Sequence, residues 1–92
     1  MAVAAGLVAC GGGGHAHPGR KLVPFAVFKQ VPLDATRGRV ERQFGTPLRT
    51  EPAGKLDPGA ICLFYPAPRD ARPATEYEFC FIAGRLHSKF AG

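Results

Sequence analysis

Three residues with reactive or metal-binding side chains lie in the C-terminal half of the chain: Cys62, Cys80 and His87. Two thiols can form a disulfide, and two thiolates with an imidazole are ligands typical of zinc, with solvent as a fourth ligand. A cysteine beside a histidine can also act as a nucleophile. The three lack the short CxxC spacing that strongly indicates zinc. Which chemistry applies therefore depends on the elements that carry them.

The strands that must position these side chains are predicted over residues 60–65, 75–83 and 85–90. The pair Ala83-Gly84 suits a tight hairpin turn between the last two. With a two-residue loop there, Ile82 lies opposite Arg85, and Glu78 lies opposite Lys89 as a favourable cross-strand charge pair. One face of the sheet then collects the large apolar side chains, which are Ile61, Leu63, Tyr65, Tyr77, Phe79, Phe81, Leu86 and Phe90.

The same argument from faces places Cys62 directly opposite Cys80. Opposed Cα atoms of antiparallel strands lie about 4.5–5.5 Å apart, which is within the range of a disulfide. We therefore predict a Cys62–Cys80 disulfide, closing a loop of about 17 residues and stabilising a small domain by about 3 kcal/mol. Two reduced, buried cysteines are the alternative.

His87 shares the face of the two cysteines in this register, so the metal and nucleophile interpretations stay open. We predict a surface histidine beside a disulfide, and no catalytic residue, cofactor or metal site. The acidic residues are spread along the chain, and nothing in the sequence places two carboxylates in one pocket for acid–base catalysis. A non-enzymatic protein is therefore expected.

The stretch from Thr36 to Pro47 has the sequence of a short helix with both ends marked. Thr36 can accept a hydrogen bond from a free backbone N–H and is predicted as the N-cap. Val40 and Phe44 lie four residues apart and share one face, which must be buried. Gly45 can adopt a positive φ, and Pro47 prevents the helix from continuing.

The segments on either side of this helix are predicted from their prolines and glycines. A first short helix is expected over residues 24–30, because Pro24 is tolerated at a first helical position and Pro32 ends the element. Residues 48–59 are rich in proline and glycine and are predicted as turns.

The N-terminal residues are predicted to be a targeting segment and a tether. Residues 1–9 are small or apolar, and Leu7-Val8-Ala9-Cys10 resembles the lipobox of bacterial lipoproteins, in which Cys10 would be acylated. We interpret residues 1–10 as a signal-peptide remnant, residues 11–21 as a flexible Gly-rich tether, and residues 22–92 as the folded domain. His15 and His17 are interpreted as solvated tether residues.

Composition restricts the class of protein further. The chain of 92 residues suffices for one domain, and it carries a net charge of +5. The basic residues are spread along the chain, whereas a nucleic-acid interface would need a dense basic patch with interleaved aromatics. No apolar run reaches the length of a membrane-spanning helix. We therefore expect no nucleic acid and no small-molecule substrate.

Taken together, the motif Thr36, Val40, Phe44, Gly45 and Pro47, the aromatic strands and the lipobox resemble the SmpA/OmlA (BamE-like) family of small bacterial lipoproteins. The resemblance covers roughly residues 23–90. It implies a fold like that of β-lactamase-inhibitor proteins, attachment to a membrane on the extracytoplasmic side, and a role in outer-membrane protein assembly or envelope integrity.

These observations predict an α+β fold with two short helices packed on one face of a three-stranded antiparallel β-meander (ααβββ). The expected function is a binding or scaffold lipoprotein of the cell envelope, whose partner is another envelope protein or the membrane itself. Arg69 and Arg72 in the loop of residues 66–74 are candidates for the contact surface. The alternatives are a β-lactamase-inhibitor-like protein-binding or sensing module, and a small Cys/His metal-binding or redox protein.

Overall fold

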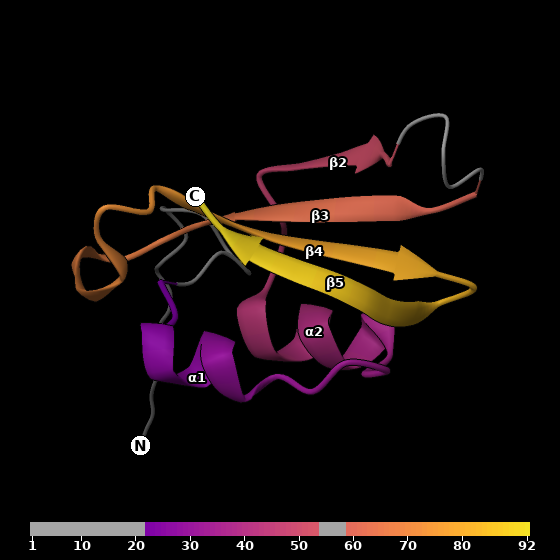
Figure 1. The fold of residues 1–92 in the computed structure, drawn as a ribbon, viewed down its shortest axis with the longest axis horizontal. Coiled ribbons are helices and arrows are strands. Elements are labelled where there is room, and N and C mark those ends of the chain that lie inside the picture. Colours follow the sequence, from indigo (N-terminus) through magenta and orange to yellow (C-terminus); the bar gives the residue numbers. More distant parts are fainter. Residues whose placement is uncertain (1–21, 54–58) are drawn as a thin grey trace, which may run out of the picture.

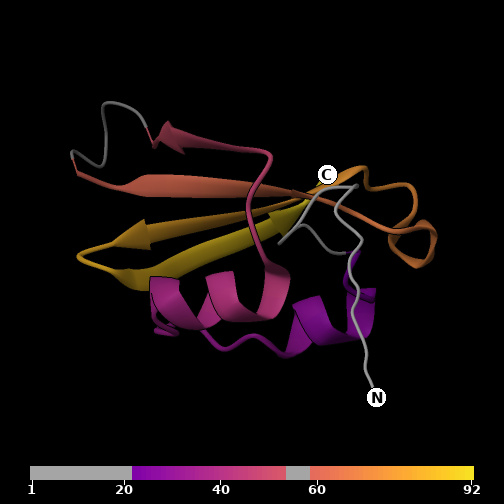
Figure 2. The same ribbon diagram turned by 180° about the vertical axis from the view of Figure 1, so that it is seen from behind.

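The computed structural model describes residues 22–53 and 59–92. The elements in these ranges are, in order, α1 (Phe25–Gln30), α2 (Arg37–Phe44), β2 (Arg49–Pro52), β3 (Ile61–Pro66), the 3-10 helix η2 (Arg69–Ala71), β4 (Glu76–Ile82) and β5 (Arg85–Ala91). Both helices lie on the same side of an antiparallel sheet (Figure 1), and the view from behind shows the same two layers (Figure 2). Neither helix has the length and apolar character needed to cross a membrane, as far as the described residues go.

The sheet has four antiparallel strands in the order β2-β3-β4-β5, so the predicted three-stranded meander is wrong. The additional strand, β2, pairs with β3 and lies at the edge of the sheet within residues predicted as turns. All of its residues are exposed, and its sequence is Arg-Thr-Glu-Pro. Charged residues and proline are typical of edge strands, which must discourage pairing with other chains. Such a strand shows no apolar alternation.

Helix α2 begins and ends at the residues that the sequence indicated. The Thr36 hydroxyl oxygen accepts from the backbone N–H of Arg39 at 3.1 Å. Gly45 follows the last helical residue with φ 86°, a conformation that favours glycine. Val40 and Phe44 are buried against the sheet.

The core between the helices and the sheet consists mainly of aromatic rings. The ring of Phe28 in α1 stacks on Tyr77 at a centroid distance of 4.4 Å. The ring of Phe44 in α2 meets Phe79 edge-on at 4.8 Å. The remaining buried members of this core are Val23, Val31, Ala35, Val40, Leu63, Tyr65, Ala71, Ala74, Phe81 and Leu86. Burial of these side chains supplies the main driving force for a domain this small.

The predicted register is confirmed between β3 and β4 and only in part between β4 and β5. Cys62 lies opposite Cys80, as predicted. At the Ala83-Gly84 turn both residues have positive φ, and Ile82 lies opposite Arg85, as predicted. The register then shifts between Cys80 and Phe81.

This shift is a β-bulge in β5, and it reverses the faces of the second half of the strand. Cys80 lies opposite Ser88 in place of His87, so one additional residue is accommodated there. Glu78 consequently lies opposite Phe90, and the predicted Glu78–Lys89 pair is wrong. Phe90, predicted in the core, is 64% exposed.

Lys89 lies on the helix side of the sheet, opposite Phe79, and Ala91 takes the place opposite Tyr77 that Phe90 was expected to fill. Its ammonium group donates to the carbonyls of Phe28, Lys29 and Val31 at 2.7–2.8 Å. These carbonyls belong to the C-terminal end of α1, where a cation also interacts favourably with the helix dipole. Burial lowers the pKa of Lys89. The bulge thus leaves Phe90 outside the core and brings Lys89 to the C-terminal end of α1.

The connection between the helices lies along the free edge of β5. Backbone hydrogen bonds join Asp34 N–H to the Leu86 carbonyl (2.8 Å), Leu86 N–H to the Ala35 carbonyl (2.7 Å) and Arg37 N–H to the Gly84 carbonyl (3.1 Å). Thr36 and Arg85 form an isolated antiparallel bridge. This part of the sheet edge is therefore covered by the chain itself.

Candidate functional site

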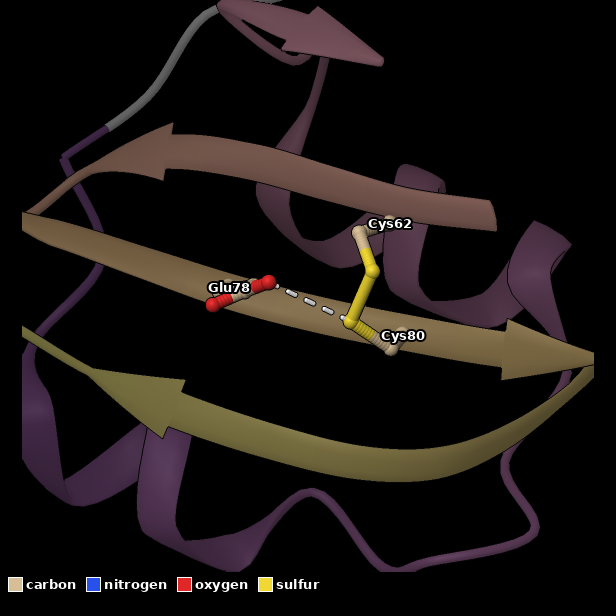
Figure 3. Close-up of a disulfide and its surroundings, with 3 residues drawn as sticks. All are labelled: Cys62, Glu78 and Cys80. Carbon is tan, nitrogen blue, oxygen red and sulfur yellow. Dashed lines mark hydrogen bonds between the residues drawn. A yellow bond between two sulfur atoms is a disulfide. The ribbon is translucent and has the colours of Figure 1, made fainter. Parts of the chain in front are cut away.

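The face of the sheet opposite the helices, which we call the outer face, carries one row of residues across all four strands. From β2 to β5, the row consists of Glu51, Cys62, Cys80 and Ser88. Its centre is a disulfide between Cys62 and Cys80, with an S–S distance of 2.05 Å and a Cα–Cα distance of 4.0 Å. The disulfide joins β3 directly to β4 (Figure 3).

The backbone pairing explains why these two cysteines approach so closely. The Ala67 N–H donates to the Thr75 carbonyl at 3.0 Å. Hydrogen-bonded and non-hydrogen-bonded pairs alternate along antiparallel strands, and counting back from this pair makes Cys62 and Cys80 a non-hydrogen-bonded pair. Opposed Cα atoms are closest in such pairs. Both side chains project from the same face of the sheet, so the two sulfurs lie close enough to form a bond.

Glu78 lies beside the disulfide, two residues before Cys80 and on the same face. Its Oε2 atom is 3.4 Å from Cys80 Sγ, the contact marked by the dashed line in Figure 3. A disulfide sulfur carries no proton, so a hydrogen bond there requires the thiol form. One ligand atom from each of Cys62, Glu78 and Cys80 lies within 4.8 Å of the other two.

The two cysteines and Glu78 line a hollow of about 280 Å³ on the outer face. Its other lining residues include Glu51, Phe64, Ile82, His87 and Ser88. Cys62 is buried and Cys80 is half-buried, so the disulfide forms the floor of the hollow. The sequence prediction grouped His87 with the cysteines. The structure puts His87 in the lining of the hollow, and within the described residues the compact group of metal-type ligands contains Glu78 instead.

A second polar group on the outer face is organised around Arg49 of β2. Its guanidinium donates to Glu51 at 2.7 Å and to both carboxylate oxygens of Glu76 at 2.8 and 3.0 Å. It also lies over the ring of Phe64, 4.1 Å from the centroid. The bond from Arg49 lowers the pKa of Glu76. Exposed ion pairs contribute little stability, but this network ties the edge strand to β3 and β4.

The predicted contact loop is an ordered segment with two exposed cations. Arg69 is the first residue of the short helix η2 and Arg72 directly follows its last residue, and both are exposed. Between them, the Asp70 carboxylate accepts from the Phe25 N–H at 3.3 Å, at the first residue of α1. A hollow beside the loop is lined by both arginines together with Ala67, Pro68, Pro73, Ala74 and Thr75. The two guanidinium groups are therefore held on a surface fastened to the helix layer.

The predictions for the N-terminal segment lie outside the described residues. They concern the lipidated Cys10, the signal-peptide remnant at residues 1–10, and the tether at residues 11–21 with His15 and His17. They stay predictions from the sequence.

Comparison with known proteins found no protein-family model, no curated protein and no solved structure that matches this chain. The resemblance to the SmpA/OmlA family thus stays a prediction from the motif around Thr36 and from the aromatic strands.

Proposed function

We propose that the chain is a non-enzymatic binding module of the cell envelope, held at a membrane by a lipid on Cys10. The observation that carries this proposal is the Cys62–Cys80 disulfide. Structural disulfides form and persist in oxidising compartments and are common in small exported domains with limited cores. The resemblance of the Cys10 region to a lipobox supports membrane attachment in such a compartment.

The surface proposed for the partner is the loop that carries Arg69 and Arg72. Loops positioned by a rigid scaffold carry binding functions more often than the strands they connect. Asp70 fastens this loop to the start of α1, so little conformational freedom is lost on binding. Two exposed guanidinium groups suit an acidic partner, which in this setting is another envelope protein or an anionic membrane surface. A role in outer-membrane protein assembly or envelope integrity is what the family resemblance adds.

The experiment that tests membrane attachment is metabolic labelling with a palmitate analogue of the protein produced from its own gene in its own host. We expect label in the membrane fraction, and its loss when Cys10→Ser is introduced. The Cys62→Ala/Cys80→Ala variant is the matched control and should keep the label. An unlabelled protein that fractionates with the cytosol would contradict the proposal.

The contact surface is tested by replacing Arg72 with a photo-crosslinking amino acid in the same host. We expect irradiation to give a discrete adduct from position 72. Arg39, an exposed arginine on α2, is the matched control position and should give none. Adducts of equal yield from both positions would show that the loop is not a specific contact surface.

A further inference from the structure

We propose that reduction of the Cys62–Cys80 disulfide creates a metal site on the outer face of the sheet, in which Cys62, Cys80 and Glu78 bind one Zn²⁺ ion. Each of these three side chains offers one metal-ligating atom, and the three atoms lie within 4.8 Å of one another. They come from two neighbouring strands and point to the same side of the sheet (Figure 3).

The distances between the donor atoms suit a tetrahedral ion. Zn–S bonds of about 2.3 Å at a tetrahedral angle place two sulfur ligands about 3.8 Å apart. The Cα atoms of Cys62 and Cys80 lie 4.0 Å apart on paired strands. Once the sulfurs are no longer bonded to each other, rotation of the two side chains can bring them to this separation without moving the strands. Glu78 Oε2, at 3.4 Å from Cys80 Sγ, already lies where an oxygen ligand of the same ion would be needed.

The surroundings of the three ligands give a metal ion access and a fourth ligand. The hollow above the disulfide is open to solvent on the outer face, so a water molecule can complete the coordination. Arg49, the cation on the neighbouring edge strand, is engaged by Glu51 and Glu76. The negative charge of Glu78 and the two thiolates is therefore available to the ion.

The site depends on the redox state because the two sulfurs are either bonded to each other or available to a metal. A dithiol reductant supplies two electrons and two protons. Its own sulfurs are oxidised to a disulfide, while the Cys62–Cys80 bond breaks and leaves two thiols. Zn²⁺ then displaces both thiol protons and binds the thiolates. Soft thiolate ligands favour zinc over magnesium or calcium.

The test uses the full chain with Cys10→Ser, so that Cys62 and Cys80 are its only cysteines. The protein is reduced with a phosphine and titrated with Co²⁺, a spectroscopic substitute for zinc. We expect one equivalent to bind, with a thiolate-to-cobalt charge-transfer band and the visible bands of tetrahedral cobalt. Zn²⁺ should displace the cobalt, and the oxidised protein should show neither band.

Variants assign the ligands. Glu78→Gln should weaken Co²⁺ binding by about tenfold or more, because it removes an anionic ligand. Glu76→Gln changes charge in the same way two residues earlier, where the carboxylate is bound by Arg49, and should change affinity by less than about twofold. Equal affinity of wild type and Glu78→Gln would overturn the assignment of Glu78.

The reduced protein must be folded for the result to count, and near-ultraviolet circular dichroism of the two buried tyrosines reports this. Zn²⁺ should raise the unfolding temperature of the reduced protein and leave that of the oxidised protein unchanged. A reduced chain that stays unfolded in Zn²⁺, or that folds but shows no charge-transfer band, would overturn the proposal. Because Cys10 is replaced throughout, the result is independent of lipidation.

Discussion

At the scale of single residues, two tyrosine hydroxyl groups connect the sheet to the helix layer. Tyr65 donates to the carbonyl of Gly45 at 2.9 Å, just after α2. Tyr77 donates to the carbonyl of Val23 at 2.8 Å, just before α1. Both side chains are fully buried. Burial raises the pKa of Tyr77 to about 12, with a smaller contribution from Asp70, and also raises the pKa of Tyr65.

These shifts predict the alkaline behaviour of the protein, because Tyr65 and Tyr77 are the only tyrosines in the chain. A folded-state pKa raised above the unfolded value means that folding favours the neutral hydroxyl. The stability this provides is complete below pH 10 and is lost as the pH rises through the folded-state values. Absorbance at 295 nm should therefore stay flat through pH 10 and rise together with unfolding.

The unfolded protein in guanidinium is the control for this titration, and both tyrosines should ionise there near pH 10. A rise of half the full amplitude near pH 10, with native far-ultraviolet circular dichroism, would mean that one hydroxyl is exposed to solvent and would contradict the packing.

At the scale of the elements, the bulge in β5 determines which side chains stabilise α1. It turns Lys89 toward the carbonyls at the C-terminal end of α1 and leaves Phe90 on the outer face opposite Glu78. The stability of variants at Lys89 and at Phe90 therefore distinguishes the observed register, which contains the bulge, from the predicted register without a bulge.

Lys89→Met should lower the free energy of unfolding by about 1–2 kcal/mol, because the carbonyls of Phe28, Lys29 and Val31 lose a charged donor. Phe90→Ser is the matched control and should cost less than about 0.5 kcal/mol, because Phe90 is largely exposed. Urea unfolding of the two variants and the wild type measures both changes. A larger loss for Phe90→Ser than for Lys89→Met would support the regular register.

The elements also show how far the sequence alone can predict this fold. Thr36 and Gly45 delimit α2 through local backbone chemistry, and the apolar alternation of β3 and β4 is strong enough to place Cys62 opposite Cys80. Strand β2 has no apolar alternation because it is an edge strand exposed along its whole length.

The bulge was not predictable, because register was counted from the Ala83-Gly84 turn and nothing in the residues around His87 marks an extra position. Glu78 could have been found as a neighbour of the disulfide. It precedes Cys80 by two residues and so shares its face, but the prediction assigned it to Lys89. The sequence therefore predicted the two cysteines of the candidate site but did not identify Glu78 as their neighbour.

At the scale of the whole molecule, the disulfide links the two central strands of a small domain on the side away from the helices. The aromatic core holds the sheet against α1 and α2 from one side only. The Cys62–Cys80 bond acts on the other face, where the described helices provide no cover. Its contribution comes mainly from restricting the unfolded chain between residues separated by 18 positions.

Replacing both cysteines, Cys62→Ala/Cys80→Ala, should lower the free energy of unfolding by about 3 kcal/mol. For a domain of this size, such a loss corresponds to a fall of about 15 °C in the unfolding temperature. Differential scanning calorimetry measures it, with Cys10→Ser as the matched control, which should unfold like the wild type. An unchanged unfolding temperature in the double variant would mean that the bond contributes no stability.

The pairing of the α1–α2 connection with β5 has a consequence for how the molecule fluctuates. Asp34 N–H and Leu86 N–H are bonded in opposite directions across this contact. Neither N–H can exchange with solvent while the α1–α2 connection stays hydrogen-bonded to β5. Amide hydrogen exchange at Asp34, which belongs to the helix layer, and at Leu86, which belongs to the sheet, thus reports one shared opening event. We therefore expect the α1–α2 connection and β5 to open together, with equal exchange protection at these two amides.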